Sequence, residues 1–210
     1  MADRTEIVGS HTWPGRLRRA LVAAVLVAVT VAAGAGCGSS AAEGPPDTSA
    51  LPDPSGPYSL KVEPCESAPE ASGGASPGLP ALRLPCLGSG PSVDLAQLTG
   101  EPTVVNVWAS WCGPCRREMP GMQQVYQEYG DEVRFLGVNT RDDPRAAAAF
   151  VEELAVTYPQ VIDQDGRLLR HLGAPGLPVT LVLDAQGRVT AKHLGEMTPE
   201  QLRAAIEEAR

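Results

Sequence analysis

Cys112 and Cys115 are the residues whose type and spacing most clearly predict chemistry. Only Gly113 and Pro114 separate them, so the two thiols can close a small disulfide ring and open it again. β-branched and aromatic residues precede the pair, which indicates a buried strand, and a helix-forming run follows it. The sequence therefore predicts a strand that ends in a Cys-x-x-Cys turn and continues directly into a helix. This arrangement suits thiol–disulfide exchange.

The two cysteines should differ in role, because they occupy different positions at the start of the helix. Cys112 lies at the helix N-terminus, where free backbone N–H groups and the helix dipole favour a thiolate. We expect it to be the exposed nucleophile. Cys115 lies one turn further along and is expected to be the buried resolving thiol, which attacks the mixed disulfide on Cys112. Gly113 and Pro114 keep the turn tight and help to set the redox potential of the pair.

Other uses of a Cys-x-x-Cys pair fit the sequence less well. A zinc site needs four ligands, and neither a second Cys-x-x-Cys nor a His pair is present. Covalent haem attachment needs a His directly after the second cysteine, where this chain has Arg116. Residues 163–166 resemble the start of a calcium loop, but the later ligands are missing and a turn is favoured. We therefore expect no metal, and no cofactor other than the redox-active disulfide.

Length, charge and cysteine count restrict the classes to which the chain can belong. Its 210 residues suffice for one packed domain with additional segments. The net charge of −8 disfavours nucleic acid as a partner, since phosphate binding needs a basic face. Five cysteines is an odd number, and in an exported chain the simplest interpretation is two pairs and one cysteine with a separate role.

The N-terminus has the order of segments that an export signal requires. Arginines within residues 16–19 precede an uncharged apolar run, 20–33, and small residues follow it up to Cys37. The apolar run is short for a transmembrane helix, which needs about 20 residues, but a signal anchor stays open. We assign residues 1–37 to an export signal, a lipoprotein signal or an anchor. The domain that follows is therefore expected outside the cytoplasmic membrane and attached to it.

The small residues on both sides of Cys37 resemble a bacterial lipoprotein signal. In that family Cys37 would become the lipidated first residue of the mature chain. Gly34 departs from the pattern, which prefers Leu or a similar apolar residue at its place. The alternative is an ordinary cleavage site with an unpaired or buried cysteine nearby, which would release the chain as a secreted protein.

Residues 38–91 are rich in Pro, Gly and Ser, which is typical of a linker between an anchor and a catalytic domain. Cys65 and Cys86 lie within this range. In an oxidising compartment they are expected to form a disulfide, which on the chain-entropy model stabilises by roughly 3 kcal/mol and pins a loose segment onto the domain. A second redox pair that relays electrons to Cys112, or two free thiols, are the alternatives.

Residues 92–210 alternate strand and helix signals. We expect a short edge strand near Val93, and Thr198 and Pro199 are expected to cap the last helix. The expected strands cover residues 103–109, 133–139, 158–163, 179–184 and 189–193, and the expected helices cover 113–129, 145–154, 167–172 and 199–209. This order predicts an α/β fold with a central mixed sheet flanked by helices.

The motif Trp111-Cys-Gly-Pro-Cys115, followed much later by Gly-Leu-Pro178 before a strand, resembles the thioredoxin superfamily. Asn106, the run after Cys115 and an extra segment, residues 144–163, are closer to its extracytoplasmic TlpA/ResA-like branch. The resemblance covers residues 92–210. It implies a thioredoxin-like fold with an insertion between the central strand–helix units, and a cis Pro178 that packs beside the cysteine pair.

The resemblance also assigns a role to Glu118. In the ResA-like branch a glutamate at this place is close to the active site and modulates the cysteine pKa values, and a carboxylate near a thiol can take or return its proton. The alternative is an ordinary acid that complements the helix dipole. Asn106 stands where cytoplasmic thioredoxins carry a buried Asp, so Glu118 is the better candidate for proton transfer. Trp111 is expected to cover one side of the disulfide.

Two functional hypotheses of different classes follow. The first is a membrane-tethered thiol–disulfide oxidoreductase, expected to be a monomer, that acts on cysteines of exported proteins. The resemblance implies mostly reduction, including that of apocytochrome c before haem attachment, with a membrane electron donor; oxidation for folding stays open. The second is a binding module that holds copper(I) on the same thiols. Met119, Met122 and Met197 provide no Met-rich ligand set for it.

Overall fold

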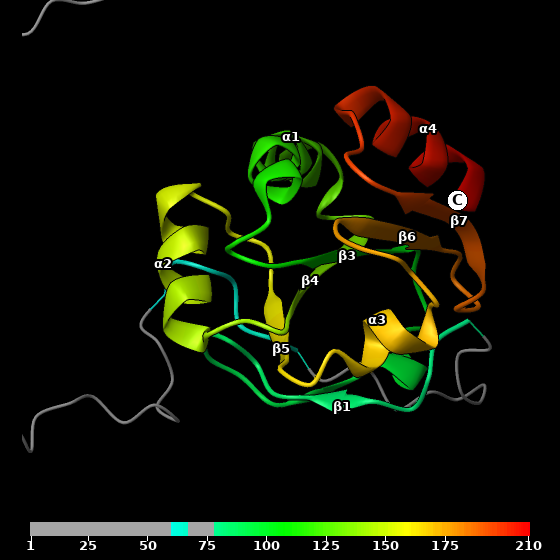
Figure 1. Ribbon diagram of the computed structural model, residues 1–210. Helices are drawn as coiled ribbons and strands as arrows, with labels where there is room; N and C mark the ends of the chain where they lie inside the picture. Colours follow the sequence, from blue (N-terminus) through cyan, green and yellow to red (C-terminus); the bar gives the residue numbers. More distant parts are fainter. Residues whose placement is uncertain (1–59, 67–77) are drawn as a thin grey trace, which may run out of the picture. The chain divides into compact units, whose positions relative to one another are not determined.

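The computed structural model describes residues 60–66 and 78–210, and these form a five-stranded mixed sheet with helices on both faces (Figure 1). The strand order is β5-β4-β3-β6-β7. The central strand β3 (Thr103–Trp108) is parallel to β4 (Arg134–Thr140) and antiparallel to β6 (Val179–Leu183). β4 pairs in parallel with β5 (Gln160–Asp163), and β6 forms a hairpin with β7 (Val189–Leu194).

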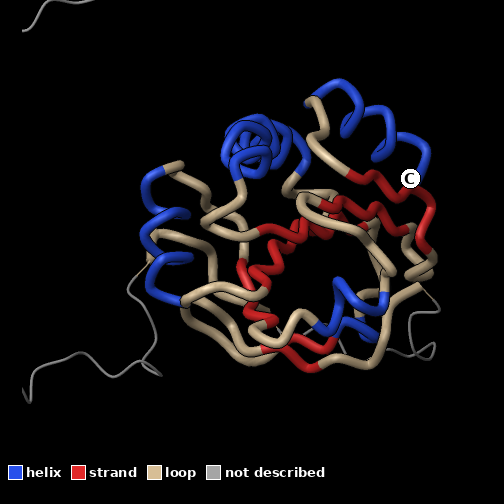
Figure 2. Tube along the Cα trace, viewed as in Figure 1, coloured by secondary structure: helices blue, strands red, loops and turns tan. Residues whose placement is uncertain are grey.

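Two hydrophobic cores lie on opposite faces of this sheet. The first face is covered by α1 (Gly113–Tyr129), α2 (Pro144–Glu153) and α4 (Pro199–Ala209), whose apolar side chains form one cluster. The other face is covered by α3 (Arg167–His171) and by the small pair of strands described below. Figure 2 shows the helices on the two sides of the sheet. β3 is buried throughout because both cores enclose it.

A second, two-stranded sheet precedes β3 in the chain. It pairs β1 (Arg83–Leu84) with β2 (Val93–Asp94), and the short 3-10 helix η2 (Leu95–Gln97) follows. We expected a strand near Val93; it ends at Asp94, whose carboxylate accepts a hydrogen bond of 3.1 Å from the Ala96 backbone and so starts the 3-10 turn.

The predicted α/β fold with a central mixed sheet is confirmed, and each expected element of the main sheet is present with ends that differ by two residues or fewer. β5 begins at Gln160 and not at Tyr158, because Pro159 has no backbone N–H to offer to the ladder. The last helix starts as expected: Thr198 and Gln201 form a capping box, with Pro199 in the first turn.

Part of the range predicted as a linker, 38–91, packs on the domain. The side chains of Leu84 and Leu87 are fully buried, and Val62 joins the core beside α1 and α2. Cys65 forms a disulfide with Cys86, and its backbone N–H donates to Ser89. The packed domain therefore includes residues upstream of 92. The predicted signal, Cys37 and the rest of the linker lie outside the described residues.

Candidate active site

The Cys112–Cys115 disulfide lies where β3 passes into α1. Cys112 is the N-cap of α1, and its sulfur accepts a hydrogen bond of 3.2 Å from the backbone N–H of Cys115. The preceding turn is closed by the Cys112 N–H, which donates to Ala109. Pro114 fits the first turn of the helix, where no backbone N–H donor is required. The Cys115 N–H and the helix dipole can stabilise a thiolate on Cys112.

The two cysteines are both largely buried, although Cys112 is the more accessible one. Cys112 is 5% exposed and Cys115 is fully buried. The expectation of an exposed Cys112 is therefore wrong in degree: its side chain turns toward the helix N-terminus and belongs to the hydrophobic core beneath α1. The neighbouring Trp111, in contrast, is 63% exposed. Trp111 therefore presents its ring to solvent next to a largely buried Cys112.

Pro178 comes to the same end of the sheet as the disulfide. The Leu177–Pro178 peptide bond is cis. The strand that follows runs antiparallel to β3 and pairs Val179 with Val107, so Pro178 lies at the level of Trp108, the last residue of β3. Only the resemblance predicted this proximity, because it arises from strand pairing across more than 60 residues of chain.

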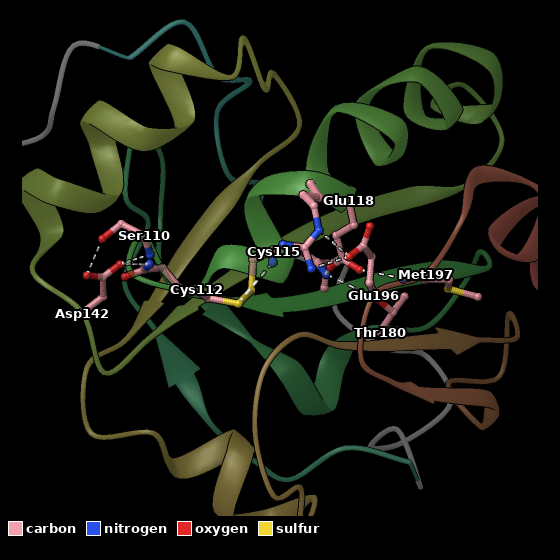
Figure 3. Close-up of a disulfide and its surroundings, with 11 residues drawn as sticks. Ser110, Cys112, Cys115, Glu118, Asp142, Thr180, Glu196 and Met197 are labelled. Atoms are coloured by element: carbon pink, nitrogen blue, oxygen red, sulfur yellow. Dashed lines mark hydrogen bonds and ion pairs between the residues drawn. A yellow bond between two sulfur atoms is a disulfide. The ribbon is translucent and has the colours of Figure 1, made fainter. Parts of the chain in front are cut away.

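Glu118 has its carboxylate inside the protein. It is 3% exposed and accepts hydrogen bonds from the Asn106 side-chain amide at 2.8 Å and from the Met197 backbone at 2.9 Å (Figure 3). Burial raises the pKa of Glu118 from 4.5 to about 7; the bonds from Met197 and Asn106 oppose that rise, and the nearby Glu196 charge adds to it. The carboxyl can therefore change protonation near neutral pH, one helical turn after Cys115.

Asn106 on the central strand β3 donates the hydrogen bond that ties Glu118 to the sheet. Its amide nitrogen also lies 3.3 Å from the Thr180 hydroxyl, whereas its buried oxygen has no hydrogen-bond partner. Thr180 lies opposite Asn106 in the β3–β6 ladder. Neither Thr180 nor Met197 could be identified from the sequence, since a hydroxyl on a strand and a backbone N–H carry no local signal of a distant carboxylate.

A third loop contacts the turn before the disulfide, and sequence analysis missed it. The Asp142 carboxylate accepts hydrogen bonds from the Ser110 backbone at 2.6 Å and from the Ser110 hydroxyl at 2.8 Å (Figure 3). The Trp111 indole N–H donates to the Arg141 carbonyl at 3.1 Å. The only signal was positional: Arg141 and Asp142 follow a strand parallel to β3 and thus come to the same sheet edge.

The side chains considered for substrate steering or for metal binding have other contacts in the structure. Arg116 and Arg117 form exposed ion pairs with Glu153 and Glu196. The three methionines considered for copper(I) have buried side chains in the core: Met119, Met122 and Met197. Within residues 60–66 and 78–210 no group of three or more His, Cys, Asp or Glu side chains could hold a metal ion. The Asp163 carboxylate caps a turn by accepting bonds from Arg167 and Leu168.

Comparison with known proteins agrees with this geometry. The Redoxin family profile matches residues 67–209, about two thirds of the chain. The chain belongs to the Redoxin family. Within the thioredoxin superfamily it is TlpA/ResA-like: it is 31% identical over 119 residues to the thiol-disulfide oxidoreductase ResA of Halalkalibacterium halodurans, covering 56% of this chain and 68% of that one. The chain thus spans about two thirds of that relative.

Solved structures show the same fold in this Redoxin-family chain. A DsbF homologue from Corynebacterium diphtheriae is 35% identical, with a TM-score of 0.57, and the match covers 62% of this chain and 85% of that one. A secreted Mycobacterium tuberculosis disulfide oxidoreductase, homologous to E. coli DsbE, is 26% identical, with a TM-score of 0.55 and coverage of 61% and 96%. The chain is a thiol–disulfide oxidoreductase, and its redox group is a cysteine disulfide.

Proposed function

We propose that this protein is a membrane-tethered, extracytoplasmic oxidoreductase that uses Cys112 and Cys115 to reduce disulfides of exported proteins. The observation that supports this dithiol chemistry is Glu118, a buried carboxyl with a pKa of about 7, one turn after the resolving cysteine. A base that can take the Cys115 proton near neutral pH serves the step in which Cys115 must become a thiolate.

The proposed reaction starts from the reduced pair. The Cys112 thiolate, stabilised by the N–H groups at the start of α1, attacks one sulfur of a substrate disulfide, and the other substrate sulfur leaves as a thiolate. Glu118 takes the proton from Cys115, whose sulfur then attacks Cys112 and releases the second substrate thiol. The substrate gains two electrons and two protons, one passed on from Cys115 by Glu118 and one taken from solvent, and the enzyme is left as the Cys112–Cys115 disulfide. A dithiol donor at the membrane must return those electrons.

The location is proposed on two grounds. The segment up to Cys37 has the sequence pattern of an export or lipoprotein signal, and the M. tuberculosis relative is described as secreted. Within the described residues no helix is long and apolar enough to cross a membrane.

We propose lipidation of Cys37 as the attachment, with a signal anchor as the alternative. Mass spectrometry of the membrane-bound protein tests this: a mature N-terminus at Cys37 with a diacylglycerol adduct is expected, and an unmodified Cys37 contradicts it.

The substrate class includes, on our proposal, the cysteines of apocytochrome c. A Cys115→Ser variant leaves a mixed disulfide on Cys112 without a resolving thiol, so it should retain its partners covalently. Isolation of these adducts from membranes identifies the substrates, with Cys112→Ser as the matched control that captures none. Equal capture by both variants contradicts the proposed attack by Cys112.

The direction of electron flow is tested by the reduction potential of the Cys112–Cys115 pair. A potential near that of thioredoxin, about −270 mV, supports reduction, and one near −120 mV means that the protein is an oxidant. The full chain in detergent should also reduce insulin when a dithiol is supplied, and Cys112→Ser should abolish the activity. Activity that persists in Cys112→Ser rules out the proposed mechanism.

A further inference from the structure

The carboxylate of Asp142 uses every hydrogen-bonding position that it has. One oxygen accepts from the Ser110 backbone at 2.6 Å and from the Asn139 side-chain amide at 2.8 Å. The other accepts from the Ser110 hydroxyl at 2.8 Å and from the Asp143 backbone at 2.9 Å. Four donors fill the lone-pair sites of an ionised carboxylate. Asp142 therefore has no remaining capacity to act on a substrate, and what it does is fix the groups that donate to it.

Those donors belong to two loops at the same edge of the sheet. Ser110 lies in the loop that leads from β3 to the disulfide, and Asn139, Asp142 and Asp143 belong to the end of β4 and the loop into α2. β3 and β4 are parallel and pair Trp108 with Asn139, which brings their two loops together. Asp142 thus ties the loop that carries Trp111 to a loop about 30 residues further along the chain.

Arg141 completes the connection in a strained backbone conformation. Its φ of 51° lies in the left-handed region, which is unfavourable for a residue with a side chain. In this conformation its carbonyl accepts the Trp111 indole N–H at 3.1 Å. Its side chain lies across Gly166, where a Cβ would come within 2.3 Å of the guanidinium Nε. The loop of residues 141 and 142 is therefore hydrogen-bonded to Ser110 on one side and packs closely against Gly166 on the other.

We propose that Asp142 and the Arg141 carbonyl are positioning groups that hold Trp111 as a rigid wall beside Cys112 and so select protein disulfides over small disulfides. Trp111 is 63% exposed, and an exposed ring without its N–H bond would sample several rotamers. Fixing it in advance removes an ordering cost from the docking of a large substrate. On this proposal a small disulfide, which needs no docking surface, depends little on the ring. This inference rests on the proposed function.

The test compares two substrates in the full chain in detergent, reduced beforehand with a dithiol. In Asp142→Asn the amide NH₂ replaces one acceptor oxygen, so one backbone N–H, that of Ser110 or that of Asp143, loses its acceptor. We expect kcat/KM for insulin to fall about tenfold through KM, because docking and not chemistry is impaired. We expect the rate with 5,5′-dithiobis(2-nitrobenzoate) to stay within about twofold of the wild-type rate. We expect the reduction potential to stay at the wild-type value.

Asp143→Asn is the matched control, since Asp143 lies in the same loop but caps α2 by accepting bonds from Arg145 and Ala146. It should change stability little, since Asn is about as good an N-cap as Asp, and should leave the ratio of the two rates unchanged. Trp111→Phe is the second variant, which keeps an aromatic ring at an exposed position and removes the N–H donor together with part of the ring surface; it should raise the KM for insulin as well. If Asp142→Asn does not fold, Trp111→Phe alone tests whether the fixed ring favours protein disulfides.

A spectroscopic measurement checks the mechanism directly. The hydrogen exchange of the Trp111 indole N–H, followed by NMR, should accelerate about tenfold or more in Asp142→Asn and stay unchanged in Asp143→Asn. An unaltered ratio of insulin to small-disulfide rates in both Asp142→Asn and Trp111→Phe overturns the inference. So does an equal loss with both substrates, which means that the loop acts on the chemistry. Failure of the wild type to reduce insulin contradicts the proposed function and not the positioning.

Discussion

The carboxylate of Glu118 accepts a hydrogen bond of 2.8 Å from the side-chain amide of Asn106 inside the hydrophobic core. Asn106 lies on the central strand and Glu118 on the helix that carries the cysteines, so the bond ties the sheet to the active-site helix. A neutral amide cannot compensate the charge of a carboxylate, and burial therefore dominates: it raises the pKa of Glu118 to about 7. Glu118 therefore titrates near neutral pH, one turn from the cysteine pair that exchanges disulfides.

This raised pKa makes stability depend on pH. The folded chain binds the Glu118 proton up to a pH of about 7, whereas in the unfolded chain the pKa is about 4.5. Between these values the folded state binds more protons, so the free energy of unfolding falls as the pH rises, by about 3 kcal/mol in total. Urea denaturation of the oxidised protein at several pH values should show this fall.

Glu118→Gln should remove the fall, because an amide does not titrate. The matched control is Glu128→Gln on the same helix, since Glu128 is exposed and its pKa is lowered by the bond from Arg203. That variant should keep the decline between pH 4.5 and 7. An equally steep decline in wild type and Glu118→Gln excludes Glu118 as its source.

The same titration predicts the pH dependence of turnover. The resolving step needs the basic form of Glu118, so the rate at which Cys115 resolves a mixed disulfide should rise as the pH increases through about 7. Glu118→Gln should lower this rate by roughly 10²-fold at pH 8 and flatten its profile near pH 7. Stopped-flow kinetics of a preformed mixed disulfide measure the step. A profile that keeps its inflection near pH 7 in the variant assigns the titration to another group.

The sequence was sufficient for the features that depend on local spacing. The strand–turn–helix around Cys112, the capping box at Thr198 and the order of the sheet elements follow from short patterns that the structure reproduces. Glu118 could be placed near the cysteines because three residues are almost one helical turn. Its raised pKa could not be inferred, since it comes from burial by elements far apart in the chain; the residues that enclose its carboxylate, Asn106 and Met197, are 12 and 79 residues away.

Long-range packing also explains the two differences from expectation. The exposure of Cys112 was overestimated because a position at a helix N-terminus gives no information on how the core closes around it. The packed part of the range before residue 92 was hidden by its Pro and Gly content. Isolated leucines there, such as Leu84 and Leu87, become buried only because β1 and the Cys86 bridge to Val161 bring them to the sheet.

The Cys65–Cys86 disulfide should be structural. It closes a loop with a separation of 21 residues and holds the segment around Val62 on the core. Replacing both cysteines by Ser should lower the free energy of unfolding by about 3 kcal/mol, since the unfolded chain regains the entropy of the loop. Insulin reduction by Cys112 should be retained below the new melting temperature. Loss of turnover in a folded double variant indicates instead that this pair relays electrons.

Gly137 on β4 has to lack a side chain. A Cβ there would lie 1.8 Å from Oε1 of Gln160, a fully buried side chain that accepts the Trp108 indole N–H at 2.9 Å. Gly137→Ala must displace the glutamine and leave that N–H without a partner, at a cost of about 2–4 kcal/mol. Gly176→Ala is the control, because no atom lies within 4 Å of its added Cβ. Chemical denaturation measures both, and equal stabilities would mean that Gln160 relaxes without cost.

Asn106→Asp tests why the central strand carries an amide and not an acid. The substitution places a second carboxyl within about 2.8 Å of Glu118, and two such groups cannot both ionise in a buried site. At pH 5 the pair can share a proton in a hydrogen bond, so the loss of stability should be small. At pH 8 the loss should be several-fold larger, because one acid must stay protonated or both charges must be exposed.

Thr180→Val is the matched control for Asn106→Asp, since it removes the hydroxyl beside the Asn106 amide without adding a charge. Its loss of stability should be the same at pH 5 and pH 8. Urea denaturation of the oxidised proteins at the two pH values gives the comparison. Equal losses in Asn106→Asp at both pH values would mean that the new carboxyl turns away from Glu118, and the amide would then be needed for its shape and not for its neutrality.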